Sequence, residues 1–238
     1  MKRKAFISVF LSILILLNLS ACGFKNEHFE ESVAAKAANV KYAALTFDDG
    51  PYTPVTNKIL DVLEKYNSKA TFFIVGNRAE LYPESVKRAY SLGCEIGNHT
   101  YSHADLCSKS HAVIEDELRG CSNVILKITG EREALFRPTG GKNDECLRKD
   151  SGRAVILWSV DTLDWSHKNS AKTARAVLDN IEDGSIVLMH DLIPSTGKAC
   201  EIIIPELKKR GYELVTVSEL LELNGITPEQ GKRYYKAK

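Results

Sequence analysis

Residues 45–51 read LTFDDGP, an apolar, β-favouring run that ends on two adjacent carboxylates and a turn. Asp and Gly are favoured turn formers, so a solvated turn is one interpretation of Asp48 and Asp49. Like charges side by side repel each other, and the second interpretation is a cation held between these carboxylates and further ligands. The choice depends on which residues the rest of the chain brings to the same place.

Strand-like and helix-like stretches alternate from Tyr42 onward. The stretch YAALTF (42–47) predicts a strand, and residues 56–69 carry Ile59, Leu63 and Tyr66 at helical spacing. Similar pairs continue to YELVTV (212–217), which gives about seven β/α units. This pattern predicts an α/β fold with a parallel sheet covered by helices, either as a compact barrel or as an open doubly wound sheet. The polar, basic tail ITPEQGKRYYKAK (226–238) predicts no element.

Composition excludes several classes of function. Of 238 residues, 44% are hydrophobic and 26% are charged, which is an ordinary globular balance. The formal net charge of +1 gives no basic excess, so we expect no nucleic-acid partner. No GxGxxG follows the first predicted strand and no GxxxxGK[ST] occurs, so nucleotide binding has no support.

The N-terminus is expected to be an export signal. A basic MKRK is followed by about fifteen apolar residues and by LSAC (19–22), which resembles a bacterial lipobox. We therefore expect a lipoprotein signal peptide over 1–21, a lipidated Cys22 that begins a polar tether over 22–40, and a single domain over 41–238. The protein would then be exported and lipid-anchored to the outer face of the cytoplasmic membrane. An ordinary secretory signal or an uncleaved anchor is the alternative.

The remaining cysteines do not form a recognisable zinc site, because no CxxC pair occurs. Their number is odd, and spacing alone does not give a disulfide pairing. They are interpreted as packing residues or as members of bridges: Cys94, Cys107, Cys121, Cys146 and Cys200.

Polar residues gather where the predicted strands end, which is where active sites form in parallel α/β folds. The residues at these ends are Asp48 and Asp49, His99 and His103, Arg137, Asp161, Asp164 and Trp165, and His190 and Asp191. Two imidazoles four residues apart can bind one ion, and one carboxylate completes a three-ligand site with an open position for water. The second carboxylate of the pair is then free to act as a base on that water.

Five short motifs occur in order along the chain: TFDDG (46–50), HTYSH (99–103), RPTGG (137–141), DTLDW (161–165) and LMH (188–190). Together they resemble the polysaccharide deacetylase family, which includes peptidoglycan N-acetylglucosamine deacetylases and chitin deacetylases. The resemblance covers about residues 41–223, and it implies a distorted (β/α)7 barrel in a single catalytic domain.

The resemblance also implies a role for each matching residue. Asp48 would be the general base, paired with Arg137, and Asp49, His99 and His103 would bind a divalent metal ion, with zinc expected and cobalt or another first-row ion as alternatives. His190 would be the general acid, with Asp161 orienting it. Trp165 and Leu188 would line the acetyl pocket, and the backbone N–H of Gly140 would help to bind the oxyanion. The roles of Asp164 and His167 stay open.

The implied activity is metal-dependent removal of N-acetyl groups from a polysaccharide, with peptidoglycan N-acetylglucosamine as the expected substrate. A xylan-type O-acetyl esterase and a chitooligosaccharide deacetylase are alternatives. A non-catalytic glycan-binding lipoprotein and a metal-dependent phosphoesterase are weaker ones. The third motif departs from the commonest family form, which has Pro where Thr139 stands and often Tyr at Gly140, and this leaves the substrate range open. We expect a monomer whose partners are the acetylated polysaccharide and the membrane.

Overall fold

The computed structural model of the chain describes residues 40–238. The expected signal peptide, Cys22 and all of the tether before Val40 lie outside these residues. The strands are β1 (Lys41–Asp48), β2 (Thr71–Ile74), β3 (Glu95–Asn98), β4 (Leu135–Phe136), β5 (Ala154–Ile156), β6 (Val160–Asp161), β7 (Ile186–His190), β8 (Tyr212–Leu214) and β9 (Arg233–Tyr234). The helices are α3 (Thr53–Lys65), α4 (Gly76–Leu81), α5 (Pro83–Ser91), α6 (His111–Thr129), α7 (Glu145–Asp150), α8 (Asp164–His167), α9 (Ser170–Asn180), α10 (Pro194–Lys209) and α11 (Val217–Leu223), with a 3₁₀ turn η2 (Thr139–Gly141).

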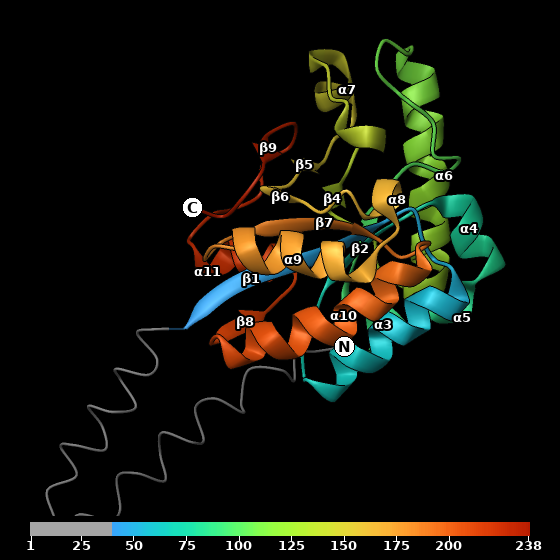
Figure 1. Cartoon of the computed structure of the whole chain (residues 1–238). Coiled ribbons are helices and arrows are strands. Elements are labelled where there is room, and N and C mark those ends of the chain that lie inside the picture. The colour runs from blue at the N-terminus through green and yellow to red at the C-terminus, as the bar shows by residue number, and fades with distance from the viewer. Residues whose placement is uncertain (1–39) are drawn as a thin grey trace, which may run out of the picture. The chain divides into compact units, whose positions relative to one another are not determined.

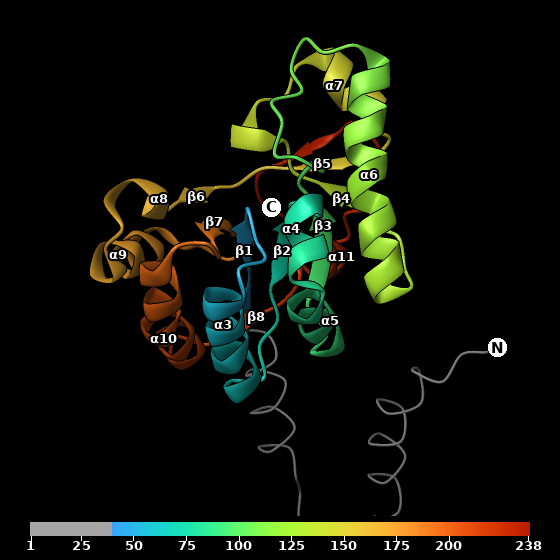
Figure 2. The same ribbon diagram turned by 90° about the vertical axis from the view of Figure 1, so that its right-hand side faces the viewer.

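The strands form one curled parallel sheet in the order β6-β7-β1-β2-β3-β4-β5-β9, with β8 paired to the start of β1. Helices α9, α10, α3, α5 and α6 cover its outer face in that sequence, and neighbours in this row pack against each other (Figures 1 and 2). The result is a distorted half-barrel of the α/β class, as the repeated β/α pattern predicts.

Alternation along β1 separates the outer core from the barrel interior. Ala43, Leu45 and Phe47 belong to the apolar core that β1 shares with α3 and α10. Because successive strand residues point to opposite faces, Thr46 and Asp48 point into the barrel. There both accept hydrogen bonds from a buried arginine of the β4 end. The period of two therefore places an apolar row under the helices and a polar row facing the site.

One predicted strand is two strands in the structure. The stretch AVILWSVD (154–161) divides into β5, which pairs with β4 and β9, and β6, which pairs with β7. The N–H of Leu157 bonds to the carbonyl of Tyr234, whereas the N–H of Ser159 bonds to that of Ile186. The chain thus passes from one edge of the curled sheet to the other around Trp158. The single strand that this apolar stretch predicts is corrected accordingly.

The C-terminal tail, for which the sequence predicts no element, contributes to the sheet. Arg233 and Tyr234 form β9 alongside β5, and Lys236 makes an isolated antiparallel bridge to Ser185. Tyr234 is buried in an apolar cluster that also contains Val217, Leu220 and Leu221 of α11. The tail is polar, so the sequence does not predict this strand. Pairing with β5 and burial of Tyr234 stabilise it in the folded chain.

The cysteines of the described residues are all free. Cys94, Cys121 and Cys200 are buried, in keeping with the packing interpretation. Among the helices of residues 40–238, none has the length and apolar character needed to cross a membrane.

Candidate active site

A cleft of ≈ 350 Å³ lies at the carboxyl ends of the parallel strands. Its lining residues come from six different strand ends or the loops that follow them, and they are Asp48, Asp49, His99, His103, Gly140, Gly141, Trp158, Asp161, Trp165, Leu188 and His190. Of the site residues predicted within residues 40–238, only Arg137 does not line the cleft. It is buried behind Asp48.

Asp49, His99 and His103 form a compact donor set. Oδ1 of Asp49 lies 2.9 Å from Nε2 of His103 and 3.3 Å from Nε2 of His99. One donor atom from each residue lies within 4.8 Å of the others, and no second such group occurs within residues 40–238. One carboxylate and two imidazoles with an open side are the donor set of a divalent metal site, so these residues fit such an ion.

Local backbone and hydrogen bonds aim these three side chains. Asp49 and His103 have φ of 72° and 64°, in the left-handed region that turns the chain sharply. The Nδ1 of His99 lies 2.6 Å from the carbonyl of Arg137, so it donates there and leaves Nε2 for the donor set. Burial alone would raise the pKa of Asp49, but hydrogen bonds from His103 and His99 outweigh it and hold that pKa well below its usual range.

Arg137 holds Asp48 from behind. Its guanidinium donates to Oδ1 of Asp48 at 2.8 Å and to the Thr46 hydroxyl at 2.6 Å, and it also donates to the carbonyls of Ile156 and Leu157. Arg137 is 0% exposed and its guanidinium packs over the ring of Phe73. This buried ion pair, supported by the further bonds of the guanidinium, fixes the position of the Asp48 carboxylate.

His190 is held by Asp164. Nδ1 of His190 lies 2.7 Å from Oδ1 of Asp164, and Oδ2 of Asp164 accepts the backbone N–H of His190 and the Thr196 hydroxyl. Burial alone would lower the pKa of His190, but the hydrogen bond and charge of Asp164 raise it to about 9. Burial likewise opposes ionisation of Asp164, yet its bonds to His190 and Thr196 keep its pKa below the ordinary value.

The expected partner of His190, Asp161, is corrected by this geometry. Asp161 is exposed, and its Oδ1 accepts the N–H of Leu163 at 2.9 Å. Leu163 then turns the chain at φ 52° and the next residue, Asp164, is buried beneath His190. Asp161 therefore caps the loop that positions Asp164.

Gly140 and Gly141 form one wall of the cleft in the 3₁₀ turn, with φ of 61° and 71°. A Cβ on Gly140 would meet no other atom within 4 Å, whereas one on Gly141 would lie 2.6 Å from the indole of Trp158. Trp158 thus packs directly on Gly141. Trp158 is not part of any of the five motifs, and its only signal in the sequence is its position in the middle of one apolar stretch.

Trp165 and Leu188 both line the cleft, with Trp165 54% exposed and Leu188 buried. His167 lies in the loop after Trp165, but both ring nitrogens are engaged locally. Nε2 lies 3.0 Å from the carbonyl of Thr162, and Nδ1 accepts the N–H of Asn169. His167 therefore supports the loop and does not reach into the cleft.

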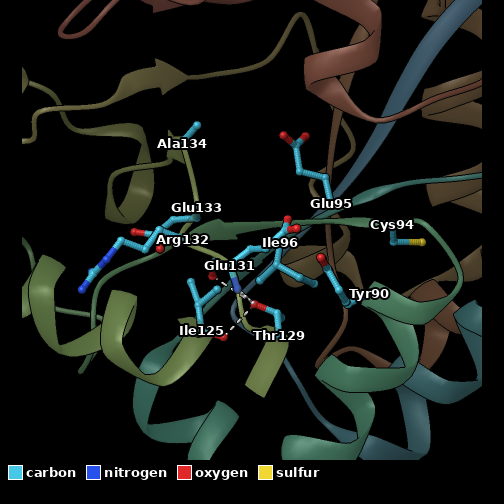
Figure 3. Close-up of a pocket in the computed structure, with 10 residues that line it drawn as sticks. All are labelled: Tyr90, Cys94, Glu95, Ile96, Ile125, Thr129, Glu131, Arg132, Glu133 and Ala134. Atoms are coloured by element: carbon cyan, nitrogen blue, oxygen red, sulfur yellow. Dashed lines mark hydrogen bonds between the residues drawn. The ribbon is translucent and has the colours of Figure 1, made fainter. Parts of the chain in front are cut away.

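A second cavity, of ≈ 240 Å³, lies at the opposite, N-terminal end of β3 (Figure 3). Glu95, Glu131 and Glu133 contribute to its walls, and Glu95 is bonded to Ser218 while Glu133 is bonded to Arg153. Glu95 and Glu133 therefore each connect separate elements of the fold. The catalytic residue types gather at the strand carboxyl ends instead.

Comparison with known proteins agrees with this geometry. A family model described as polysaccharide deacetylase matches residues 35–155. Over 191 residues the chain is 40% identical to a peptidoglycan-N-acetylglucosamine deacetylase of Bacillus cereus, covering 77% of this chain and 89% of that relative. The chain belongs to the polysaccharide deacetylase family.

The chain is also similar to a second peptidoglycan deacetylase and to an acetyl xylan esterase of known structure. The chain is 42% identical over 186 residues to the peptidoglycan-N-acetylmuramic acid deacetylase PdaC of Bacillus subtilis, covering 78% of this chain, but it spans only 40% of PdaC. A family 4 acetyl xylan esterase from Clostridium thermocellum, in complex with a cobalt ion, superposes with a TM-score of 0.78 and 36% identity, covering 82% of this chain and 98% of the esterase. The polysaccharide deacetylase fold thus accounts for the whole of the described half-barrel.

Proposed function

We propose that the protein is a metal-dependent hydrolase that removes N-acetyl groups from the amino sugars of peptidoglycan. The observation that carries the proposal is the convergence of Asp49, His99 and His103 with Asp48 and His190 in one cleft. The relatives named for deacetylation of N-acetylglucosamine and N-acetylmuramic acid units support peptidoglycan as the substrate.

The residues of the cleft divide the chemistry of amide hydrolysis between them. Asp49, His99 and His103 would hold a divalent cation, which supplies Lewis-acid activation of water and of the acetyl carbonyl. Asp48, held in place by its ion pair with Arg137, takes a proton from the attacking water. His190, kept protonated by Asp164, gives a proton to the departing nitrogen. The products are acetate and a free amine.

The remaining lining residues position the acetyl group. Trp165 and Leu188 offer apolar surface to its methyl, and the backbone N–H of Gly140 is assigned to the carbonyl oxygen as negative charge develops there. Because Gly140 has no side chain, the wall beside it is open to a bulky sugar. We propose zinc as the resident ion, since two imidazoles and a carboxylate suit it, and cobalt as a functional substitute.

Acetate release from three polymers tests the activity. Metal-loaded protein is incubated side by side with N-acetylated peptidoglycan, chitooligosaccharide and O-acetylated xylan. We expect acetate from peptidoglycan, and none after the metal is removed with a chelator until zinc or cobalt is restored. Faster release from xylan than from either N-acetylated polymer would favour the esterase alternative, and no release from any polymer would overturn the proposal.

We further propose that the protein is exported and anchored by lipid on Cys22, on the outer face of the cytoplasmic membrane. The support is the sequence alone: a basic start, an apolar stretch and LSAC at 19–22. A tethered enzyme suits a substrate fixed in the wall. Cys22→Ala should give a soluble or unprocessed form, and unchanged membrane retention without a mobility shift would contradict lipidation.

A further inference from the structure

Asp191, which follows the proposed acid His190, is a buried carboxylate that the mechanism does not use. It is 1% exposed, and its Oδ1 has no hydrogen-bond partner among the described residues. Its backbone N–H donates to the carbonyl of Asp48. Burying a carboxyl group is costly unless the surrounding structure gains from it, so its place needs a physical reason.

The carboxyl group of Asp191 lies directly against Gly50. A Cβ added to Gly50 would lie 2.0 Å from Oδ1 and 2.1 Å from Oδ2 of Asp191, far inside van der Waals contact. Gly50 is not in the left-handed region, so its backbone conformation does not itself require glycine. The close approach of Asp191 is therefore the reason that this position lacks a side chain.

Thr56, in the first turns of α3, joins the same group to the other end of the turn. Its hydroxyl donates to Oδ2 of Asp191 at 2.5 Å and accepts the N–H of Tyr52 at 2.8 Å. Thr56 is buried as well. Asp191 thus contacts the segment from Asp48 to Tyr52 at three points: a carbonyl, a Cα and, through Thr56, an N–H.

We infer that Asp191 is a positioning residue that fixes the turn carrying the base and the metal ligand relative to the acid on β7. Asp48 on β1 and His190 on β7 are register partners on adjacent strands. Asp191 follows His190 in the chain, and its contacts hold the segment that follows Asp48. Asp49 stands at the start of the braced turn with φ 72° and has to keep that conformation to meet His99 and His103. The catalytic consequence rests on the proposed function, whereas the effect on metal binding does not.

Reciprocal substitution tests this inference. Asp191→Ala removes the brace and should lower kcat by about 10- to 100-fold with little change in KM, because small displacements of reacting groups cost rate. It should also weaken Co²⁺ binding about 10-fold, as loss of supporting contacts around metal ligands does. Gly50→Ala should be at least as damaging in the wild-type background because its methyl group meets the carboxyl group of Asp191. In the double variant, that methyl group occupies the vacated space, so activity and Co²⁺ affinity should exceed those of Gly50→Ala.

Thr56 provides a milder second perturbation. Thr56→Val should reproduce the direction of the Asp191→Ala effects, and Thr56→Ser, which keeps the hydroxyl, should restore kcat. Thr173→Val is the matched control, because Thr173 is also buried but its hydroxyl donates locally, to the carbonyl of Asn169 at the start of α9. It should leave kcat and Co²⁺ affinity unchanged.

The outcomes separate the inference from the proposed function. Additive losses in the Gly50→Ala/Asp191→Ala double variant, together with wild-type Co²⁺ affinity in Thr56→Val, would overturn the positioning role. Wild-type protein that releases no acetate would overturn the function alone, and the pattern of Co²⁺ affinities would still decide the role of Asp191. If Asp191→Ala does not fold, the Thr56 pair carries the test.

Discussion

Oδ1 of Asp164 lies 2.7 Å from Nδ1 of His190, and Oδ2 of the same carboxylate accepts the backbone N–H of His190 at 2.9 Å. One buried carboxylate therefore bonds both the side chain and the backbone of His190 and fixes the orientation of the imidazole. The Nδ1–H is directed to Asp164, which leaves Nε2 for the cleft.

Exchanging the two aspartates of the DTLDW motif in turn should separate their roles. Asp164→Asn removes the charge that raises the pKa of His190, so kcat should fall by about 10- to 100-fold or more. The alkaline limb of the pH–rate profile should move to lower pH, since His190 would lose its proton sooner. Asp161→Asn keeps an acceptor for the N–H of Leu163 and should cause little change. The opposite ranking would return the orienting role to Asp161.

The sequence predicts where the chemistry gathers but not which of these two aspartates serves His190. Strand ends in a parallel sheet converge, so the positions of Asp48, His99, Arg137 and His190 follow from the β/α pattern and the motif order. The choice between Asp161 and Asp164 depends on a single left-handed residue, Leu163, and this position carries none of the residues that favour such a backbone, namely Gly, Asn or Asp. Burial of Asp164 is visible only in three dimensions.

The same distinction applies to the fold. The apolar stretches predict most of the strands because each is buried on both faces by helices and the barrel interior. The division of 154–161 into β5 and β6 depends on how far the sheet curls, which is a property of all the strands together. Likewise, the polar tail forms β9 only because β5 presents a free edge to it.

Titration of His190 gives a pH prediction. In protein without a metal ion its pKa is raised to about 9, and part of that rise comes from the charges of Asp48 and Asp49. A cation bound by Asp49 offsets the negative charge of the two carboxylates near His190. Adding Zn²⁺ should therefore lower the pKa of His190. Histidine ¹⁵N chemical shifts followed against pH, with and without Zn²⁺, measure both values. A pKa that Zn²⁺ leaves unchanged would mean that the ion binds elsewhere.

Removal of Arg137 should damage stability as well as activity. Arg137→Met leaves Asp48 buried without its partner, and breaking a buried pair in this way typically costs about 3–5 kcal/mol. Asp48→Asn in the same chain should recover part of that loss, because it removes the uncompensated charge. Urea unfolding measures the free energies of unfolding. Arg88→Met, at an exposed pair with Asp61, is the control and should change little. If Arg137→Met and Arg88→Met lowered the free energy of unfolding by similar amounts, burial of the Arg137–Asp48 pair would not explain the loss.

The two imidazoles of the donor set should be required for metal binding. His99→Ala or His103→Ala removes one of three ligands, so bound Zn²⁺ or Co²⁺ and acetate release should both fall steeply. Metal content after dialysis and Co²⁺ absorption measure binding directly. His111→Ala removes an exposed histidine outside the cleft and should bind as wild type does. Full activity in metal-free wild-type protein would end the mechanism proposed for this cleft.

The last prediction concerns the division of labour between Asp48 and His190. An amide nitrogen leaves poorly unless it is protonated, whereas the oxygen of an activated aryl ester leaves without a proton. Asp48→Asn removes the base needed for attack, so it should impair both substrates while the metal ion stays bound by Asp49 and the two histidines. His190→Ala should slow amide cleavage by about 10²- to 10⁴-fold, the usual contribution of a positioned acid, and should affect the aryl ester far less. Parallel measurement of acetate release from a chitooligosaccharide and from an aryl acetate gives the ratio that decides. Equal losses on the two substrates would assign His190 to the fold or to the carbonyl oxygen, and the proton would then have to come from another group in the cleft.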